Sequence, residues 1–171
     1  NATSDSFGYQ VEVGDLDGDD NPELIVGSPG ANSGQGRVLI FEQYFNGTGY
    51  EFVFMDSING SASTTSFGKE IAVGNMGGDV EFIDPQDGSG FESLAIGSPS
   101  IGGGVVSIYF GSSSVDAGRD ISISSPAGSA LFGTAIDSGY DMDGDGRSEI
   151  CIGAPNSGSN SGWTGIYSIK G

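Results

Sequence analysis

The chain of 171 residues contains no histidine, one cysteine and only five basic residues. Without histidine it can form neither a Ser–His or Cys–His nucleophile pair nor a histidine zinc ligand of its own. The single cysteine, Cys151, excludes an internal disulfide, and its place between Ile150 and Ile152 predicts a small buried apolar side chain. No apolar run approaches the roughly 20 residues of a membrane-spanning helix. We therefore expect no membrane insertion.

The charge balance is strongly acidic, with 23 acidic residues against 5 basic ones and a net charge of −18. Such a chain repels phosphate groups, so we expect no nucleic-acid partner. Hydrophobic residues make up 36% of the sequence, which excludes an acidic disordered tail. The length suits one domain of ordinary size with a hydrophobic core.

A three-fold internal repeat organises the sequence. Each copy has a Phe-Gly pair and, 20 to 30 residues later, a Gly-Ser-Pro or Gly-Ala-Pro triplet. The pairs begin at Phe7, Phe67 and Phe132, and the triplets begin at Gly27, Gly97 and Gly153. The sequence therefore predicts three units, residues 1–59, 60–125 and 126–171, of which the middle one carries a long loop.

Each unit is predicted to consist of short β-strands. An alternating strand follows the Phe-Gly pair, as at Val11 and Val13, and a continuous apolar run precedes each triplet. These runs are Leu24–Val26, Leu94–Ile96 and Ile150–Ile152, followed by third strands over Val38–Phe41, Val105–Phe110 and Gly165–Ile169. Fourth strands are predicted around Tyr50–Met55 and Ile121–Ser124, but the third unit lacks one. No amphipathic helix of two turns is apparent, so the fold class is all-β, with four antiparallel strands per unit as in propeller blades.

These motifs resemble the FG-GAP repeat, the blade unit of the integrin α-subunit β-propeller. The resemblance covers nearly the whole chain. It implies an extracellular or cell-surface β-propeller that offers a platform for protein partners and is not an enzyme. Family members usually close a ring of about seven blades, whereas three blades leave apolar faces and strand edges open. We therefore expect an incomplete propeller, extended by a longer chain or completed by copies of itself.

Two acidic loops are the strongest candidates for a ligand site. Both place carboxylates at loop positions 1, 3, 5 and 9 and offer a backbone carbonyl at position 7. The candidate ligands are Asp15, Asp17, Asp19, Asn21 and Glu23 in the first unit, and Asp141, Asp143, Asp145, Arg147 and Glu149 in the third. Clustered carboxylates repel one another unless a hard cation lies among them, and calcium accepts six to eight oxygen ligands. Gly18 and Gly144 allow the sharp turn that such a loop needs.

The resemblance likewise implies calcium in these loops, although the family usually has Asp at the ninth position where this chain has Glu. The loops are not EF-hands, because position 12 is Val26 or Ile152 instead of a glutamate. In the middle unit, Ser93 occupies the ninth position, and the acids Asp79, Glu81, Asp84, Asp87 and Glu92 follow no such spacing. We expect two structural calcium sites and a solvated loop in the middle unit, with a site that uses Asp84 and Asp87 as the alternative there.

The sequence alone leaves three functions open. The first is a calcium-binding module for protein recognition or cell adhesion. The second is a self-assembling subunit of an extracellular filament or surface layer, and the third is a non-catalytic appendage of a secreted enzyme. Candidate N-glycosylation sites lie at Asn1, Asn46 and Asn59. Trp163, at the end of a Gly/Ser loop, is a candidate for ligand contact or for packing.

Overall fold

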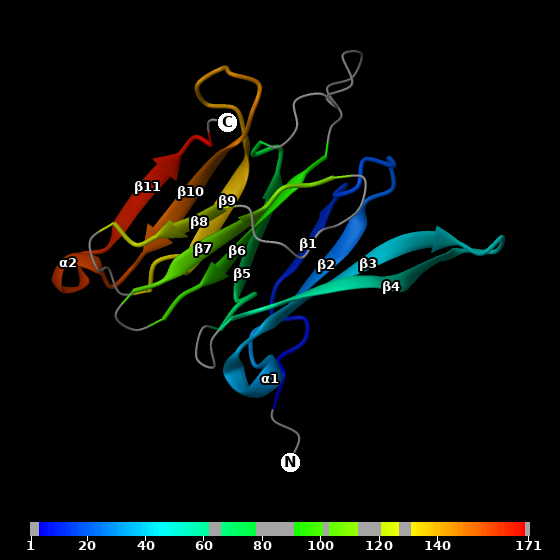
Figure 1. The fold of residues 1–171 in the computed structure, drawn as a ribbon, viewed down its shortest axis with the longest axis horizontal. Coiled ribbons are helices and arrows are strands. Elements are labelled where there is room, and N and C mark those ends of the chain that lie inside the picture. Colours follow the sequence, from blue (N-terminus) through cyan, green and yellow to red (C-terminus); the bar gives the residue numbers. More distant parts are fainter. Residues whose placement is uncertain are drawn as a thin grey trace.

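The computed structural model describes residues 4–61, 66–77, 91–100, 103–112, 121–126 and 131–169. Three antiparallel β-sheets lie side by side, each built from consecutive strands (Figure 1). The first contains β1 (Val11–Gly14), β2 (Glu23–Ser28), β3 (Arg37–Phe45) and β4 (Tyr50–Asn59). The second contains β5 (Glu70–Gly74), β6 (Ser93–Ser98), β7 (Val105–Tyr109) and β8 (Ile121–Ser124). The third contains β9 (Ala135–Tyr140), β10 (Glu149–Ala154) and β11 (Trp163–Tyr167).

This architecture confirms the predicted fold class. Every sheet is a meander in which neighbouring strands are joined in chain order, and the third sheet has three strands among the described residues. The helical segments α1 (Ala31–Gly34) and α2 (Ser157–Asn160) are single turns with left-handed residues inside them. The sheets are successive blades of a β-propeller, and within the described residues they do not close into a ring. The exact boundaries of the three units remain a prediction.

Two hydrophobic cores lie between the sheets. The first joins the facing sides of the first two sheets through residues such as Ile25, Ile40 and Ile96, and the second joins the second and third sheets through Phe132, Ile150 and Ile152. Each sheet therefore buries its apolar strands against its neighbours, which explains why β6, in the middle, is buried along its whole length.

The outer sheets test the predicted burial. Val11 and Val13 are exposed, because their face of the first sheet has no neighbour among the described residues. Cys151 was expected to be buried and is only half-buried, because it lies on the corresponding open face of the third sheet. The exposed valines agree with the expectation that three blades leave apolar faces open, whereas the prediction for Cys151 was wrong because it considered only the apolar neighbours in sequence.

The repeat motifs meet where adjacent sheets touch. A Cβ added to Gly27 would lie 2.2 Å from the carbonyl oxygen of Gly68, and one added to Gly97 would lie 2.3 Å from that of Gly133. The triplet glycine of one unit thus packs against the Phe-Gly glycine of the next. At Gly153 no further unit is described, and the nearest atom to an added Cβ lies at 3.4 Å. The two motifs therefore form the seam between neighbouring blades.

Candidate metal centres

The two acidic loops are β-hairpin connections, one between β1 and β2 and the other between β9 and β10. In each loop, the carboxylate of the first residue accepts hydrogen bonds from several backbone N–H groups of the loop. Asp15 Oδ1 accepts hydrogen bonds from the backbone N–H groups of Gly18 (2.7 Å) and Asp19 (3.2 Å), and Oδ2 accepts one from Asp20 (3.0 Å). Gly18 has a φ of +74°, a left-handed conformation that glycine adopts without strain. The carboxylate therefore fixes the loop backbone as well as carrying charge.

The third unit repeats this arrangement. Asp141 Oδ1 accepts from Gly144 (2.6 Å) and Asp145 (3.1 Å), and Oδ2 accepts from Gly146 (2.9 Å). Gly144 and Gly146 both have positive φ. In the first loop the second left-handed position is filled by Asp20, a residue type that tolerates it. The sequence prediction found the glycine at position 4 but missed the left-handed residue at position 6.

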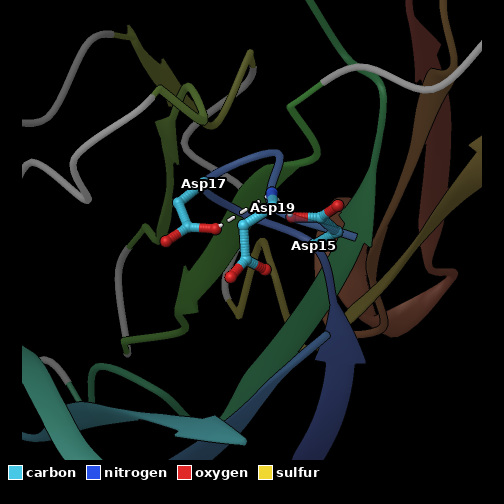
Figure 2. Close-up of side chains that lie close together, drawn as sticks. All are labelled: Asp15, Asp17 and Asp19. Atoms are coloured by element: carbon cyan, nitrogen blue, oxygen red, sulfur yellow. Dashed lines mark hydrogen bonds between the residues drawn. The ribbon is translucent and has the colours of Figure 1, made fainter. Parts of the chain in front are cut away.

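The following carboxylates are also held by the loop backbone. Asp17 Oδ1 accepts from Asp19 N (3.3 Å), and Asp19 Oδ1 accepts from Asn21 N (2.8 Å). Carboxylate oxygens of Asp15, Asp17 and Asp19 lie within 4.8 Å of one another, close enough to share one cation. Figure 2 shows these three side chains gathered around the loop.

In the third unit the residues brought together differ by one member. Oxygens of Asp141, Asp143 and Glu149 lie within 4.8 Å of one another, and Asp145 stands outside this set. In the first unit it is Glu23 that stands outside the corresponding set. Each loop therefore assembles three of its four predicted carboxylate ligands. The carbonyl role proposed for Asn21 and Arg147 at position 7 remains a prediction.

A glutamate from the second strand of the hairpin closes each loop. Glu23 is 0% exposed and Glu149 is 4% exposed. Glu23 Oε2 accepts from Leu16 N (2.7 Å), and Glu149 Oε2 accepts from Met142 N (2.6 Å). The other oxygen, Oε1, is buried in both residues and has no hydrogen-bond partner. A buried, unpartnered carboxylate oxygen is costly, so each loop presents an acceptor that a cation could satisfy.

The electrostatics of the first loop agree with this geometry. Burial, followed by repulsion from Asp17, Asp15 and Asp19, raises the pKa of Glu23 to about 7, against the opposing hydrogen bond from Leu16 N. Burial and the neighbouring Asp19 charge also raise the pKa of Asp17. The loop therefore concentrates negative charge beyond what it can neutralise itself.

The second sheet supports the first loop from outside. Asp15 N donates to Glu92 Oε2 (2.9 Å), and Glu92 N donates back to Asp15 O (2.8 Å). A Cβ added to Gly18 would meet the ring of Phe91 at 2.7 Å. The sequence reading assigned Glu92 to the middle loop. A repeat-equivalent hydrogen bond, from Ser148 N to Asn75 O (2.6 Å), joins the next pair of units.

The middle unit lacks the buried glutamate. Ser93 takes that position, is fully buried, and donates its hydroxyl to Gly77 O (3.0 Å). Asp79, Glu81, Asp84 and Asp87 lie outside the described residues. The expectation of a solvated middle loop therefore remains a prediction.

The remaining candidates have simpler surroundings. Trp163 packs against Phe132 and Tyr167, with ring centroids 5.8 and 6.4 Å away, which favours the packing role. Asn46 and Asn59 are exposed, Asn1 lies outside the described residues, and glycosylation remains a prediction. Among the described residues, no helix has the length and apolar character needed to cross a membrane.

Comparison with known proteins agrees with the repeat analysis. The FG-GAP repeat family matches residues 7–41 and 132–166, and each matched stretch contains one of the two acidic loops. The middle unit is outside these matches. Its sheet, β5 to β8, nevertheless repeats the four-stranded meander of the first sheet, β1 to β4. The four-stranded unit is therefore retained where the sequence of its loop has diverged.

Similar proteins include integrin α subunits from several animals. Integrin alpha-PS3 of Drosophila melanogaster is 29% identical over 88% of this chain, and integrin alpha ina-1 of Caenorhabditis elegans is 30% identical over 91%. Integrin alpha-6 of Gallus gallus is 34% identical over 87%. The chain spans 13% to 15% of the length of these relatives. It is an FG-GAP repeat protein, similar along most of its length to integrin α subunits.

Proposed function

We propose that this chain is a calcium-binding β-propeller module for protein recognition or cell adhesion, in which the metal is structural. The observation that carries the metal assignment is the buried, unpartnered Oε1 of Glu23 and of Glu149. Each lies in a hairpin whose loop gathers further carboxylates. The same carboxylate spacing and the same unpartnered glutamate oxygen occur in both loops, although the carboxylates that converge differ by one member, and this argues for a function that both loops share.

The donor set suits calcium. All candidate ligands are oxygens, and calcium takes six to eight of them in flexible geometry, whereas magnesium demands a near-ideal octahedron. Glu23 and Glu149 would each contribute Oε1, and the aspartates at positions 1, 3 and 5 would contribute further carboxylate oxygens. A bound cation would offset the repulsion within each loop and fix the hairpin. It would supply no chemistry, in keeping with the proposed non-enzymatic role.

Metal counting and thermal melting test this assignment together. We expect two calcium ions per chain, a melting temperature that falls in EGTA, and recovery with calcium that magnesium does not match. At about 1 mM free calcium, sites with Kd of about 0.1–1 mM would each add roughly 0.4–1.4 kcal/mol. An unchanged melting temperature in EGTA, with no calcium bound after dialysis against it, would refute the metal assignment.

The recognition role and the extracellular or cell-surface location are supported by the similarity to integrin α subunits. The net charge of −18 adds an argument against nucleic acids and anionic membranes as partners. Protein partners are therefore the proposed ligand class. Measuring binding of the protein to intact cells, with and without EGTA, tests whether adhesion depends on the loops.

A self-assembling role is the second candidate, because both outer faces expose apolar side chains. Phe7, Val11 and Val13 on the first sheet and Tyr140 and Ile166 on the third are each about half exposed or more. Further blades or further copies of the chain would cover these faces. Analytical ultracentrifugation of the chain alone is the test. A folded monomer at micromolar concentration that binds no apolar dye would contradict it.

A further inference from the structure

The hairpin formed by β3 and β4 projects beyond the rest of its sheet. β2 pairs with β3 only as far as Phe41, whereas β3 continues to pair with β4 as far as Phe45. Residues 42–53 therefore form a two-stranded ribbon, which Figure 1 shows extending away from the other sheets. In the second sheet the corresponding strands, β7 and β8, are only 5 and 4 residues long.

One face of this ribbon is aromatic. Paired residues of an antiparallel ladder share a face, and faces alternate along a strand. The pairs Phe41–Phe54, Gln43–Phe52 and Phe45–Tyr50 therefore share one side. The exposed fractions on this side are 50% for Phe52, 55% for Phe54, 56% for Phe45 and 67% for Tyr50. A contiguous exposed group of large aromatic side chains marks an interaction surface.

Blade stacking does not account for this surface. Where the second sheet packs on the first, the shared core uses Val38, Ile40 and Ile58, with Met55 at its margin, and includes no residue from 42 to 53. A further blade that docked in the same way on the opposite face of the first sheet would likewise not reach residues 42–53. The ribbon would then still be exposed, so its occupant must be something other than a blade.

The edge and the charge of the ribbon indicate what that occupant is. In the part of the chain that the structure describes, β4 is the last strand of its sheet; it is 10 residues long and contains no proline that would block pairing. On the face opposite the aromatic one, Glu42 and Glu51 alternate with Val53 and Tyr44. Residues 42–53 contain these two acids and no basic residue. A second copy of this acidic ribbon would repel the first, whereas a basic strand would be attracted.

We propose that the ribbon binds an extended segment of a partner protein, which adds as a strand along the free edge of β4. Alternate residues of that segment are apolar and contact the aromatic face, and the residues between them are Lys or Arg facing Glu42 and Glu51. This proposal rests on the recognition role proposed above and names its partner chemistry. Its aromatic face lies outside the metal loops, although the charge of Glu42 is one of those that raise the pKa of Asp17.

The test uses the intact protein in calcium and two labelled peptides of about nine residues, one alternating Val with Lys and one alternating Val with Glu. Fluorescence anisotropy should show saturable binding of the Val/Lys peptide only. Combined substitution F45S, Y50S and F52S should weaken that binding at least about tenfold. The matched control, Y140S with I166S, removes equally exposed apolar side chains elsewhere and should bind normally. Amide hydrogen exchange should slow in β4 when the peptide binds.

Three results would overturn the proposal: no saturable binding of the Val/Lys peptide, equal binding of both peptides, or unchanged binding by the triple variant. A second variant, E42K with E51K, leaves the aromatic face intact and should transfer the preference to the Val/Glu peptide; failure of that transfer also counts against it. Calcium content is measured in parallel. If the triple variant loses peptide binding but keeps two calcium ions, the result supports the ribbon as the binding site. If the parent protein binds the Val/Lys peptide but no calcium, the result contradicts only the metal assignment.

Discussion

Replacing Glu23 by Gln should stabilise the protein in the absence of calcium and weaken its stabilisation by calcium. In EGTA, Glu23 is a buried carboxylate with one unpartnered oxygen, and the neighbouring aspartates repel it. Gln keeps the shape and an acceptor for Leu16 N but carries no charge. The variant should therefore be more stable than the parent protein above pH 7. The gain is at most about 3 kcal/mol, the equivalent of raising the pKa from 4.5 to about 7.

In calcium the advantage of the variant should shrink. At about 10 mM free calcium, a site with Kd of about 0.1–1 mM stabilises the fold by roughly 1.4–2.7 kcal/mol. For a domain of this size that corresponds to about 3–11 °C in melting temperature. The variant loses most of this increment at the first site and keeps that of the third unit. Its response to calcium should be about half that of the parent.

Differential scanning calorimetry in EGTA and in calcium measures both effects. Asp137→Asn is the matched control, because it removes one exposed carboxylate that lies outside both loops. The control should leave the calcium response unchanged. If Glu23→Gln were less stable than the parent in EGTA and responded fully to calcium, the unpartnered oxygen would have no role in metal binding.

Three further perturbations test separate parts of the structure. Asp17→Ala and Asp143→Ala should each remove one calcium ion and leave the other, as counted by mass spectrometry of the native protein; loss of both from either variant would show that the loops are not independent. In EGTA, the free energy of unfolding should rise as pH falls from about 7 towards 4.5, because the raised pKa of Glu23 lets the folded state take up a proton before the unfolded chain does. Urea unfolding across this pH range measures the effect. A fall in stability would refute the raised pKa of Glu23. Gly97→Ala should destabilise the fold by several times more than Gly153→Ala in the same urea assay, since only the first Cβ would meet a backbone carbonyl, and equal effects would contradict the described seam.

Much of the strand pattern could be predicted because it depends on local sequence. The apolar runs before each triplet became β2, β6 and β10, and each acidic loop connects two antiparallel strands. Burial was harder to predict, because it depends on which sheets are neighbours. Val11 is exposed while its counterpart Ile71 is 1% exposed, although both follow a Phe-Gly pair. The difference is set by the adjacent sheet and not by the strand itself.

In the candidate metal sites, too, local features could be predicted from the sequence and contacts with distant residues could not. The spacing of Asp15, Asp17 and Asp19 predicted their convergence, because a tight turn brings alternate residues of one loop together. The support from Glu92 could not be read from that loop, since 77 residues separate it from Asp15. The unpartnered oxygen of Glu23 was equally hidden, because a sequence does not show which of two carboxylate oxygens a backbone N–H will occupy.

The middle unit shows what the ninth loop position controls. In the first and third units that position is a glutamate whose Oε2 supports the loop backbone while Oε1 stays unpartnered. In the middle unit Ser93 supports the loop backbone by a different bond, donated to Gly77 O, and leaves no buried carboxylate oxygen there. Serine thus supports the loop backbone through a hydrogen bond and adds no buried negative charge at this position. We therefore expect that replacing the glutamate by serine preserves the pairing of the two strands and removes one buried acceptor for a cation.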